Sequence, residues 1–302
     1  YALRVVQIRA GDSLTSTRLI TGAVEPPRGG LVRTEAEILT WLRDWTDVPA
    51  DTVHLALPEA VTRRLDFRRG NAFLAAGFRR EALGAFDSVR ASAWRNPVRL
   101  AQLAVFFADQ GLYGLAARSA SRHLALWPDG SVGGAHVELQ RLAYPLVYAD
   151  LLSVEVGARE LDPLLLAALI RQESLFEPTA ESYAGARGLG QVMPATGTGI
   201  ANSLDMEGFD LDDLYRPHVS ISFAAFYLRA QMNRFDDQIL VALAAYNGGP
   251  GNTLRWIEAG GEDLDLFVEL ITATQSRLYL QREYEQYLIY ERLYRSSEFA
   301  EQ

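Results

Sequence analysis

Apolar side chains recur along most of this chain at the three- and four-residue spacing of helices, and no series of alternating apolar and polar residues predicts a sheet. The segment from Glu35 to Trp45 is one example, because its large apolar side chains share one helical stripe. That stripe consists of Ile38, Leu39, Trp41, Leu42 and Trp45. Residues 26–30 and Pro49 mark loops. The sequence therefore predicts an all-α fold.

The composition excludes several kinds of site. The 302 residues include no cysteine and no lysine, which rules out a thiolate nucleophile or metal ligand, a lysine Schiff base and a Walker A loop. The net charge of −9 argues against nucleic acid as a partner, since phosphate binding needs a basic surface. No apolar run approaches the roughly 18 to 20 residues that span a bilayer. The histidines show no metal-ligand spacing; they are His54, His123, His136 and His218.

A weak internal repeat lies between residues 66 and 126. Gly77 recurs as Gly111 and Ala82 recurs as Ala116, an offset of 34 residues that matches the period of tetratricopeptide helix pairs. We expect each glycine at a helix–helix corner and each alanine where the partner helix approaches closely. Two unrelated amphipathic hairpins remain the alternative, because two copies are fewer than a solenoid usually needs.

A change in the sequence pattern marks a domain boundary near residue 145. Glycines and Pro128 interrupt the helical pattern between residues 128 and 134, and Pro145 precedes a new run of strong helices. We therefore expect a tetratricopeptide-like superhelical domain over residues 1–144 and a second helical domain over residues 145–302. Because Tyr1 opens sequence that already looks structured, we also expect further residues upstream, including any export signal.

One glutamate in the second domain shares a helical stripe with apolar residues. Asp162 and Pro163 form a strong helix start, and the predicted helix runs to Ser174. Glu173 lies four residues after Leu169, on the apolar face. Desolvation there would raise the pKa of Glu173 and keep a fraction protonated near neutrality, as a general acid requires. The alternative is a glutamate at the helix end that turns out to solvent.

Residues 182–194 form a glycine-rich loop that leads into a helix at Pro194. A phosphate cradle is excluded because no strand precedes the glycines and no lysine follows them. Glycines here would instead let the backbone approach a ligand closely, beside the amide of Gln191, which both donates and accepts hydrogen bonds.

Tyr246 and Asn247 end a helix predicted to begin near Asp237. An ordinary helix stop at Gly248 and Pro250 would explain the segment without a function. The aromatic plane and the amide nevertheless suit a sugar ring and an N-acetyl group.

The last predicted helix is rich in tyrosine, with Tyr284, Tyr287, Tyr290 and Tyr294. The helical spacing of the last three favours core or interdomain packing over binding.

Asp212 and Asp213 are interpreted as helix-start residues.

In this order, the segments resemble the soluble lytic transglycosylases, whose catalytic domain is a lysozyme-like (goose-type) helical fold. The matching motifs are Glu173-Ser174, Gly188-Leu189-x-Gln191, Ala245-Tyr246-Asn247 and Arg277-x-Tyr279. The lead-in from Tyr144-Pro145 to Leu161-Asp162-Pro163 is similar too. The resemblance covers roughly residues 140 to 295, and the N-terminal half is similar only in kind to the superhelical α-domain of these enzymes.

The resemblance implies roles at matching positions: Glu173 as the catalytic acid/base, with Ser182, Gln191, Tyr246, Asn247 and Tyr279 lining the cleft. Three departures from the family stand out: Gly190 where methionine is usual, Ser220 where asparagine is common, and Gln275-Ser276 where glutamate and threonine are common. We expect Gly190 to remove an apolar contact with the substrate that a methionine would restore, unless a positive φ at Gly190 would strain the methionine.

The family further implies cleavage of the β-1,4 bond between N-acetylmuramic acid and N-acetylglucosamine in peptidoglycan, with a 1,6-anhydro product and no cofactor or metal. Two alternatives stay open. A goose-type muramidase would hydrolyse the same bond, with Asp212, Asp213 or Glu269 orienting the water, and a non-catalytic scaffold would only bind peptidoglycan. The family also implies a periplasmic or other extracytoplasmic location and cell-wall protein partners for the helical N-terminal domain.

Overall fold

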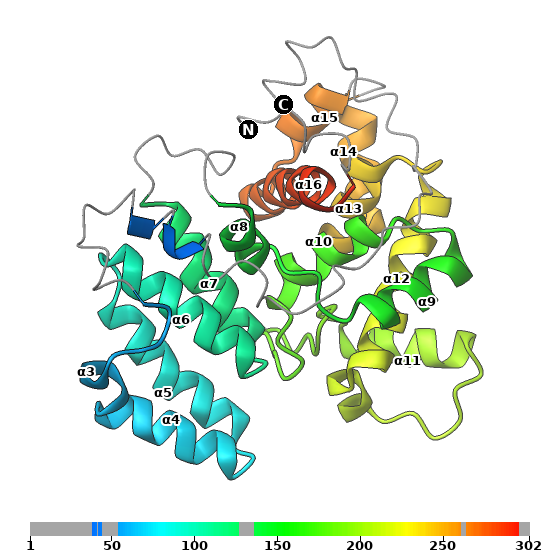
Figure 1. The fold of residues 1–302 in the computed structure, drawn as a ribbon. Coiled ribbons are helices and arrows are strands. Elements are labelled where there is room, and N and C mark those ends of the chain that lie inside the picture. The colour runs from blue at the N-terminus through cyan, green and yellow to red at the C-terminus, as the bar shows by residue number, and fades with distance from the viewer. Residues whose placement is uncertain (1–37, 41, 44–53, 127–135, 261–263, 296–302) are drawn as a thin grey trace. The chain divides into compact units, whose positions relative to one another are not determined.

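The computed structural model describes residues 38–40, 42–43, 54–126, 136–260 and 264–295 (Figure 1). Within these ranges every regular element is a helix, and two isolated β-bridges join residue 181 to 187 and residue 187 to 192. The predicted all-α class is therefore confirmed for the described residues. None of the helices described is long and apolar enough to cross a membrane.

The chain divides into two compact units between Val147 and Tyr148. The helices of the first unit are α3 (Glu59–Thr62), α4 (Leu65–Ala75), α5 (Arg79–Ser92), α6 (Pro97–Asp109), α7 (Tyr113–Leu124) and α8 (Val137–Ala143). Those of the second are α9 (Ala149–Arg159), α10 (Pro163–Ser174), α11 (Pro194–Ser203), the 3-10 helix η4 (Leu211–Tyr215), α12 (Pro217–Arg234), α13 (Ile239–Gly248), α14 (Pro250–Gly260), α15 (Leu264–Leu270) and α16 (Thr274–Tyr294).

The repeat in the first unit consists of two helix pairs, α4–α5 and α6–α7. Gly77 and Gly111 occupy the two corners with φ of +81° and +66°, a region that favours glycine. After each glycine the next N–H closes the turn: that of Phe78 bonds to the Phe73 carbonyl at 2.9 Å, and that of Leu112 to the Phe107 carbonyl at 2.8 Å. The predicted corners are confirmed, whereas a tetratricopeptide-like superhelix stays a prediction.

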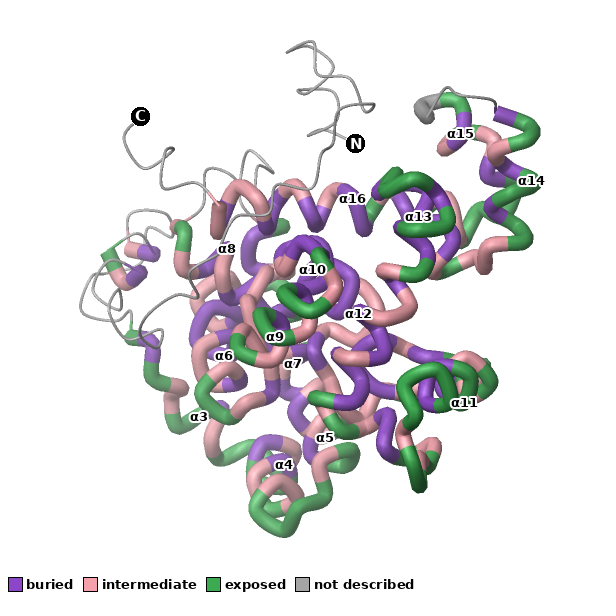
Figure 2. Tube along the Cα trace, turned by 90° about the vertical axis from the view of Figure 1, so that its right-hand side faces the viewer, coloured by how far each residue is buried: buried purple, intermediate pink, exposed green. Residues whose placement is uncertain are grey.

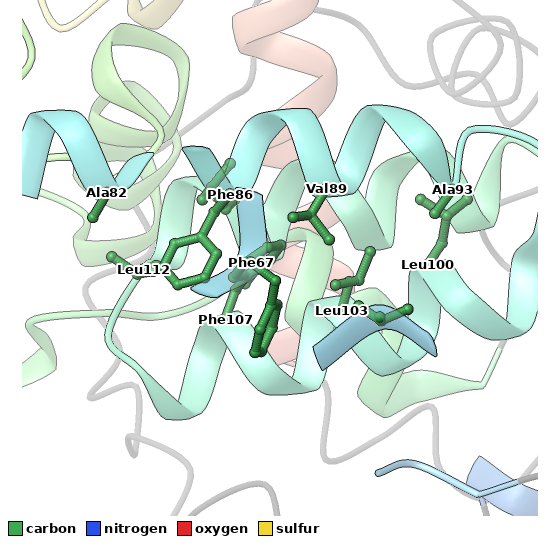
Figure 3. Packing of buried hydrophobic residues seen from close by; sticks show 12 residues of the cluster. Phe67, Ala82, Phe86, Val89, Ala93, Leu100, Leu103, Phe107 and Leu112 are labelled. Carbon is green, nitrogen blue, oxygen red and sulfur yellow. The ribbon is translucent and has the colours of Figure 1, made fainter. Parts of the chain in front are cut away.

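Aromatic rings fill the core between these helix pairs (Figure 3). The ring of Phe86 lies 5.8 Å from Phe67 and 5.5 Å from Phe107 in edge-to-face contacts. Ala82 and Ala116 are buried at the helix contacts, as the repeat predicts. The unit therefore has a hydrophobic core of its own.

Some predictions for the first half lie outside the described residues. In the helix expected from Glu35 to Trp45, residues 38–40 and 42–43 are helical, with Ile38 and Leu42 buried. The remaining positions of that segment, the loops at 26–30 and Pro49, and the breaks at 128–134 are not among the residues described.

In the second unit, α10 is packed against α9, α12 and α16 and is buried from Leu164 to Arg171 (Figure 2). Pro163 is its first residue, and Asp162 caps it by accepting a 2.8 Å hydrogen bond from the Leu164 N–H, as predicted. A helix buried on so many sides holds the groups at its C-terminal end in a fixed position.

Tyrosines of α16 anchor that helix to the start of α10. The Tyr287 hydroxyl donates a 2.7 Å hydrogen bond to Asp162, which also forms an ion pair with Arg295. Tyr287 and Tyr290 are buried, and the Tyr290 ring stacks on Tyr294 at 5.7 Å. The prediction that these tyrosines serve core packing is confirmed within the second unit.

Candidate active site

Glu173 lies in the last turn of α10, where the chain leaves the helix through left-handed backbone at Leu175 and Phe176. Its side chain is partly buried, and its Oε1 accepts a 2.6 Å hydrogen bond from the Tyr279 hydroxyl. Burial raises the pKa of Glu173 from its ordinary value of 4.5 to about 7, although the Tyr279 hydrogen bond lowers it. The expected rise in the pKa of Glu173 by desolvation, which keeps a fraction of the carboxyl protonated near neutrality, agrees with this environment.

Tyr279 reaches this carboxyl from α16 and is itself buried. Burial and the neighbouring charge of Glu173 raise the pKa of Tyr279 well above 10. The phenol therefore stays protonated at neutral pH. It is a permanent donor to the Glu173 carboxylate rather than a proton shuttle.

Tyr246 lies at the end of α13 and interacts electrostatically with Glu173. Its hydroxyl donates a 2.8 Å hydrogen bond to the Gly190 carbonyl, and its ring meets the edge of Tyr227 at 5.2 Å. Burial and, next, the charge of Glu173 raise the pKa of Tyr246 well above 10. Because the hydroxyl is already bonded to the loop, only the ring could contact a ligand, and ligand binding by Tyr246 stays a prediction.

The glycine-rich loop folds back on itself between Ala180 and Val192. Arg187 and Val192 exchange two 3.1 Å backbone hydrogen bonds. Gly188 has φ of +74°, and a Cβ there would lie 1.9 Å from the Leu214 carbonyl oxygen, so no other residue fits. The Gln191 side-chain nitrogen donates to the carbonyls of Ala180 and Gly188, which fixes the orientation of the amide within the loop.

The structure gives less direct support for Ser182 and Asn247 as ligand-binding residues. The Ser182 hydroxyl accepts a 3.0 Å hydrogen bond from the Ala186 N–H and so closes the turn that contains Gly185. Asn247 is exposed beside Tyr246 at the end of α13. The structure thus brings Glu173, Tyr246 and Tyr279 together, whereas ligand binding by Ser182, Gln191 and Asn247 stays a prediction.

Gly190 departs from the expected behaviour for a steric reason. A Cβ on Gly190 would lie 2.6 Å from the Cβ of Ala224 and 3.1 Å from the Tyr246 hydroxyl, so a side chain would point into α12. Its φ is not positive. The Gly190 N–H also donates to the buried Ser220 hydroxyl at 3.2 Å. The expectation that methionine at this position would regain a substrate contact is therefore wrong.

A second carboxyl, which the sequence analysis missed, interacts electrostatically with Glu173. Glu283 of α16 is fully buried, and neither of its oxygens has a hydrogen-bond partner among the residues that the structure describes. Burial, and next the charge of Glu173, raise the pKa of Glu283 well above 4.5, while Arg171 lowers it. Burial therefore favours the neutral form of Glu283. The available signal was its spacing, because Glu283 lies four residues after Tyr279 and four before Tyr287.

A polar cluster fixes the turn that precedes Glu173. Arg171 donates a 2.5 Å hydrogen bond to the Gln286 side-chain oxygen, and the Gln286 nitrogen donates to Gln172. Both bonds join α10 to α16, the helix that also carries Tyr279. These bonds hold α10 and α16 together near Glu173 and Tyr279, and they therefore support the hydrogen bond between the two side chains.

The acidic residues considered as activators of a water molecule are engaged elsewhere. Asp213 accepts a 3.0 Å hydrogen bond from the Asp210 N–H in a capping box at η4, which confirms the helix-start interpretation. Asp212 forms an ion pair with Arg187 at 2.9 Å, and Glu269 lies 3.8 Å from Arg277. Among the residues that the structure covers, no group of histidines and carboxylates could hold a metal ion.

Comparison with known proteins shows which family this part of the chain resembles. The Transglycosylase SLT domain family matches residues 152–265, which include Glu173, the glycine-rich loop and the Tyr246 region. The chain is 33% identical over 141 residues to the soluble lytic murein transglycosylase of Escherichia coli K12, and 29% identical over 204 residues to that of Salmonella typhimurium. These alignments cover 46% and 65% of this chain but only 22% and 30% of the relatives, so the chain spans less than a third of their length.

Solved structures agree on the fold. The 70-kDa soluble lytic transglycosylase of Escherichia coli matches 78% of this chain and 37% of its own, with a TM-score of 0.66 and 24% identity. Lytic transglycosylase Slt of Pseudomonas aeruginosa matches 83% of this chain and 40% of its own, with a TM-score of 0.64 and 25% identity. The predicted lysozyme-like helical fold of this family is confirmed. Residues 152–265 of this chain therefore match the transglycosylase SLT domain.

Proposed function

We propose that this chain is a peptidoglycan lytic transglycosylase that cleaves the β-1,4 bond between N-acetylmuramic acid and N-acetylglucosamine. The observation that carries the proposal is a single titrating carboxyl, Glu173, with a pKa of about 7 and a fixed hydrogen bond from Tyr279. A carboxyl of this pKa serves equally well as acid and as base near neutral pH. The names of the relatives, soluble lytic murein transglycosylases, support the same substrate.

The reaction uses Glu173 twice. Protonated Glu173 gives its proton to the glycosidic oxygen, and the bond from that oxygen to C1 of the muramyl residue breaks through an oxocarbenium-like state, assisted by the substrate's N-acetyl carbonyl. Ionised Glu173 then takes the proton of the muramyl C6 hydroxyl as its oxygen bonds to C1. The carboxyl returns to its starting state, and a 1,6-anhydro ring replaces the reducing end. Attack within one sugar is efficient because the nucleophile is already positioned.

The neighbours of Glu173 keep both of its states accessible. Tyr279 stabilises the carboxylate and burial stabilises the acid, so that the free energies of the two forms are close at neutral pH. Neutral Glu283 adds no second negative charge. The cleft lining assigned to Tyr246, Gln191, Asn247 and Ser182 positions the sugar, with the Tyr246 ring as an apolar face and the Gln191 oxygen as an acceptor.

Replacement of Glu173 by glutamine tests this function. The amide is nearly isosteric but cannot transfer a proton, so solubilisation of purified sacculi should fall by about 10²- to 10⁴-fold. Glu269→Gln is the matched control, since it removes an exposed carboxylate outside the proposed mechanism, and it should retain the wild-type rate. A Glu173→Gln variant with more than about a tenth of the wild-type rate would rule out the mechanism.

The same substrate implies a location and partners, which are proposed here with it. Peptidoglycan lies outside the cytoplasmic membrane, so we place the protein in the cell envelope. We propose the helical first unit as the site of contact with other cell-wall proteins. Detection of the protein in a periplasmic or cell-wall fraction tests the first point, and crosslinking through α4–α7 tests the second.

A further inference from the structure

The helices of the first unit and the second unit carry charge of opposite sign. Between residues 54 and 126 the sequence has 11 arginines but only 5 aspartates and glutamates, whereas residues 148–295 have 11 arginines and 22 acidic residues. A charge imbalance of this kind does not decide the fold, but it does decide which charged partners a surface attracts. Residues 54–126 therefore form a basic surface in an acidic chain.

Many of these arginines lie at one end of the two helix pairs. Because α4–α5 and α6–α7 are antiparallel pairs, the starts of α4 and α6 and the ends of α5 and α7 meet at the end opposite the glycine corners. Figure 3 shows this for α5 and α6, with Ala93 beside Leu100 at one end and Ala82 beside Leu112 at the other. We call the first of these the basic end; its arginines include Arg63, Arg64, Arg68, Arg69, Arg95 and Arg122.

Several arginines of the basic end are accessible and carry charge that no neighbour neutralises. Arg68, Arg69 and Arg95 are exposed, and no aspartate or glutamate in the described part of the chain forms an ion pair with them. Arg64, in contrast, forms an ion pair with Asp66 at 2.7 Å. Arg68 and Arg69 lie on the outer face of α4, because that helix packs its other face against α5. Their guanidinium groups are therefore available to an anionic partner.

We propose that the basic end of the first unit binds the carboxylates of peptidoglycan peptide stems, with Arg68 and Arg69 as the main contacts. The inference rests on the proposed function, because it adds a second surface through which the chain holds the same polymer. Peptide stems carry free carboxylates along each glycan strand, so the substrate is an anionic polymer. The acidic second unit repels such a polymer, and a basic surface on the same chain offsets that repulsion. Attachment at a second point also raises the effective concentration of the strand.

Cosedimentation with purified sacculi tests the proposal in the full chain carrying Glu173→Gln, which should bind without cleaving. The sacculi are first treated with hydrofluoric acid to remove phosphate polymers, so that carboxylates are their main anions. We expect saturable binding whose affinity falls as sodium chloride rises from about 20 to about 500 mM, because salt screens contacts between exposed charges. Conversion of the carboxylates to amides, with carbodiimide and ammonia, should remove most of this salt-dependent binding.

Substitutions on α4 test the surface itself. Arg68→Gln combined with Arg69→Gln should lower the affinity at low salt by about three- to tenfold, as the loss of two exposed ionic contacts predicts. Arg68→Lys combined with Arg69→Lys keeps both charges and should bind like the parent. The matched control is Arg255→Gln combined with Arg282→Gln, which removes two exposed arginines from the second unit and changes the net charge equally. Because all four side chains are exposed, the melting temperature should change by no more than about 2 °C in each variant.

Several outcomes would overturn the proposal. Binding that is independent of salt, an unchanged affinity after the two glutamine substitutions on α4, or an equal loss in the control pair would each do so. Undiminished binding to amidated sacculi would show that the partner group is not a carboxylate. Equal or tighter binding to phosphatidylglycerol vesicles would assign the basic end to a membrane surface instead. Glycan cleavage by the unsubstituted chain is measured separately, so failure of this inference and failure of the proposed function are distinguishable.

Discussion

The hydroxyl of Tyr279 donates a 2.6 Å hydrogen bond to Oε1 of Glu173, and the two residues come from helices 106 positions apart in sequence. This bond stabilises the carboxylate and therefore opposes the effect of burial on the pKa of Glu173.

We therefore expect Tyr279→Phe to raise the pKa of Glu173 further. The wild-type rate should fall as pH rises through about 7, because the first step needs the protonated acid. In Tyr279→Phe this descending limb of the pH–rate profile should move to higher pH. The maximal rate should fall by roughly tenfold, because the carboxylate loses a charge-assisted hydrogen bond. Initial rates on sacculi between pH 4 and 10 measure both effects. A limb unchanged from wild type, or one equally shifted in the Tyr294→Phe control, would contradict this role.

The same pKa shift makes a prediction about stability. A carboxyl whose pKa is higher in the folded state stabilises the fold fully below pH 4.5, and this contribution is lost as pH rises through about 7. Glu173→Gln should therefore be more stable than wild type at pH 8.5, by up to about 3 kcal/mol, but should gain nothing of this kind at pH 4. Urea unfolding at the two pH values measures the difference. A stability gain that is the same at both would show that Glu173 is not desolvated.

Glu283 should behave as a neutral residue. Its replacement by glutamine exchanges one uncharged polar group for another, so the pH dependence of the rate should stay within a few tenths of a unit of wild type. Glu285→Gln, on the same helix and with a side chain that is only partly buried, is the control. If Glu283 were ionised in the wild type, its charge would already raise the pKa of Glu173. Its removal would then move the limb to lower pH, which is the result that would refute neutrality.

Gly190 and Ala224 should show strong coupling. Gly190→Met should cost about 1–3 kcal/mol by overpacking against α12, and it should disturb the Tyr246 hydrogen bond. Ala224→Gly, which removes the Cβ at 2.6 Å, should recover part of that loss in the double variant. Gly199→Met is the control because a Cβ there meets nothing within 4 Å. Additive effects of the two substitutions in thermal unfolding would contradict the steric account.

Local signals in the sequence predicted the elements well. The Asp162-Pro163 start, the turn into a helix at Pro194 and the stop after Gly248 each depend on cap chemistry between neighbouring residues, and the structure confirms all three. The raised pKa of Glu173 was also predictable, because the apolar stripe on which it lies is a property of one helix.

The errors and omissions concern contacts between distant segments. Nothing near Gly190 in sequence reveals that Ala224 occupies the space beside it. The position of Glu283 next to Glu173 likewise depends on the packing of α16 against α10. The four-residue spacing of Glu283 from Tyr279 and Tyr287 is a signal for a buried face that the sequence analysis did not use, and no such spacing identifies the carboxyl that Glu283 lies near.

Product mass tests the central claim most directly. Sacculi digested with the purified chain, and analysed without a reduction step, should release muropeptides that end in 1,6-anhydro-N-acetylmuramic acid. Hydrolysis would leave a free reducing end that is one water heavier and reducible by borohydride. With Glu173 as the single titrating carboxyl of the site, and with Asp212, Asp213 and Glu269 occupied by caps or ion pairs, we predict anhydro products. A product set dominated by reducing ends would contradict the account.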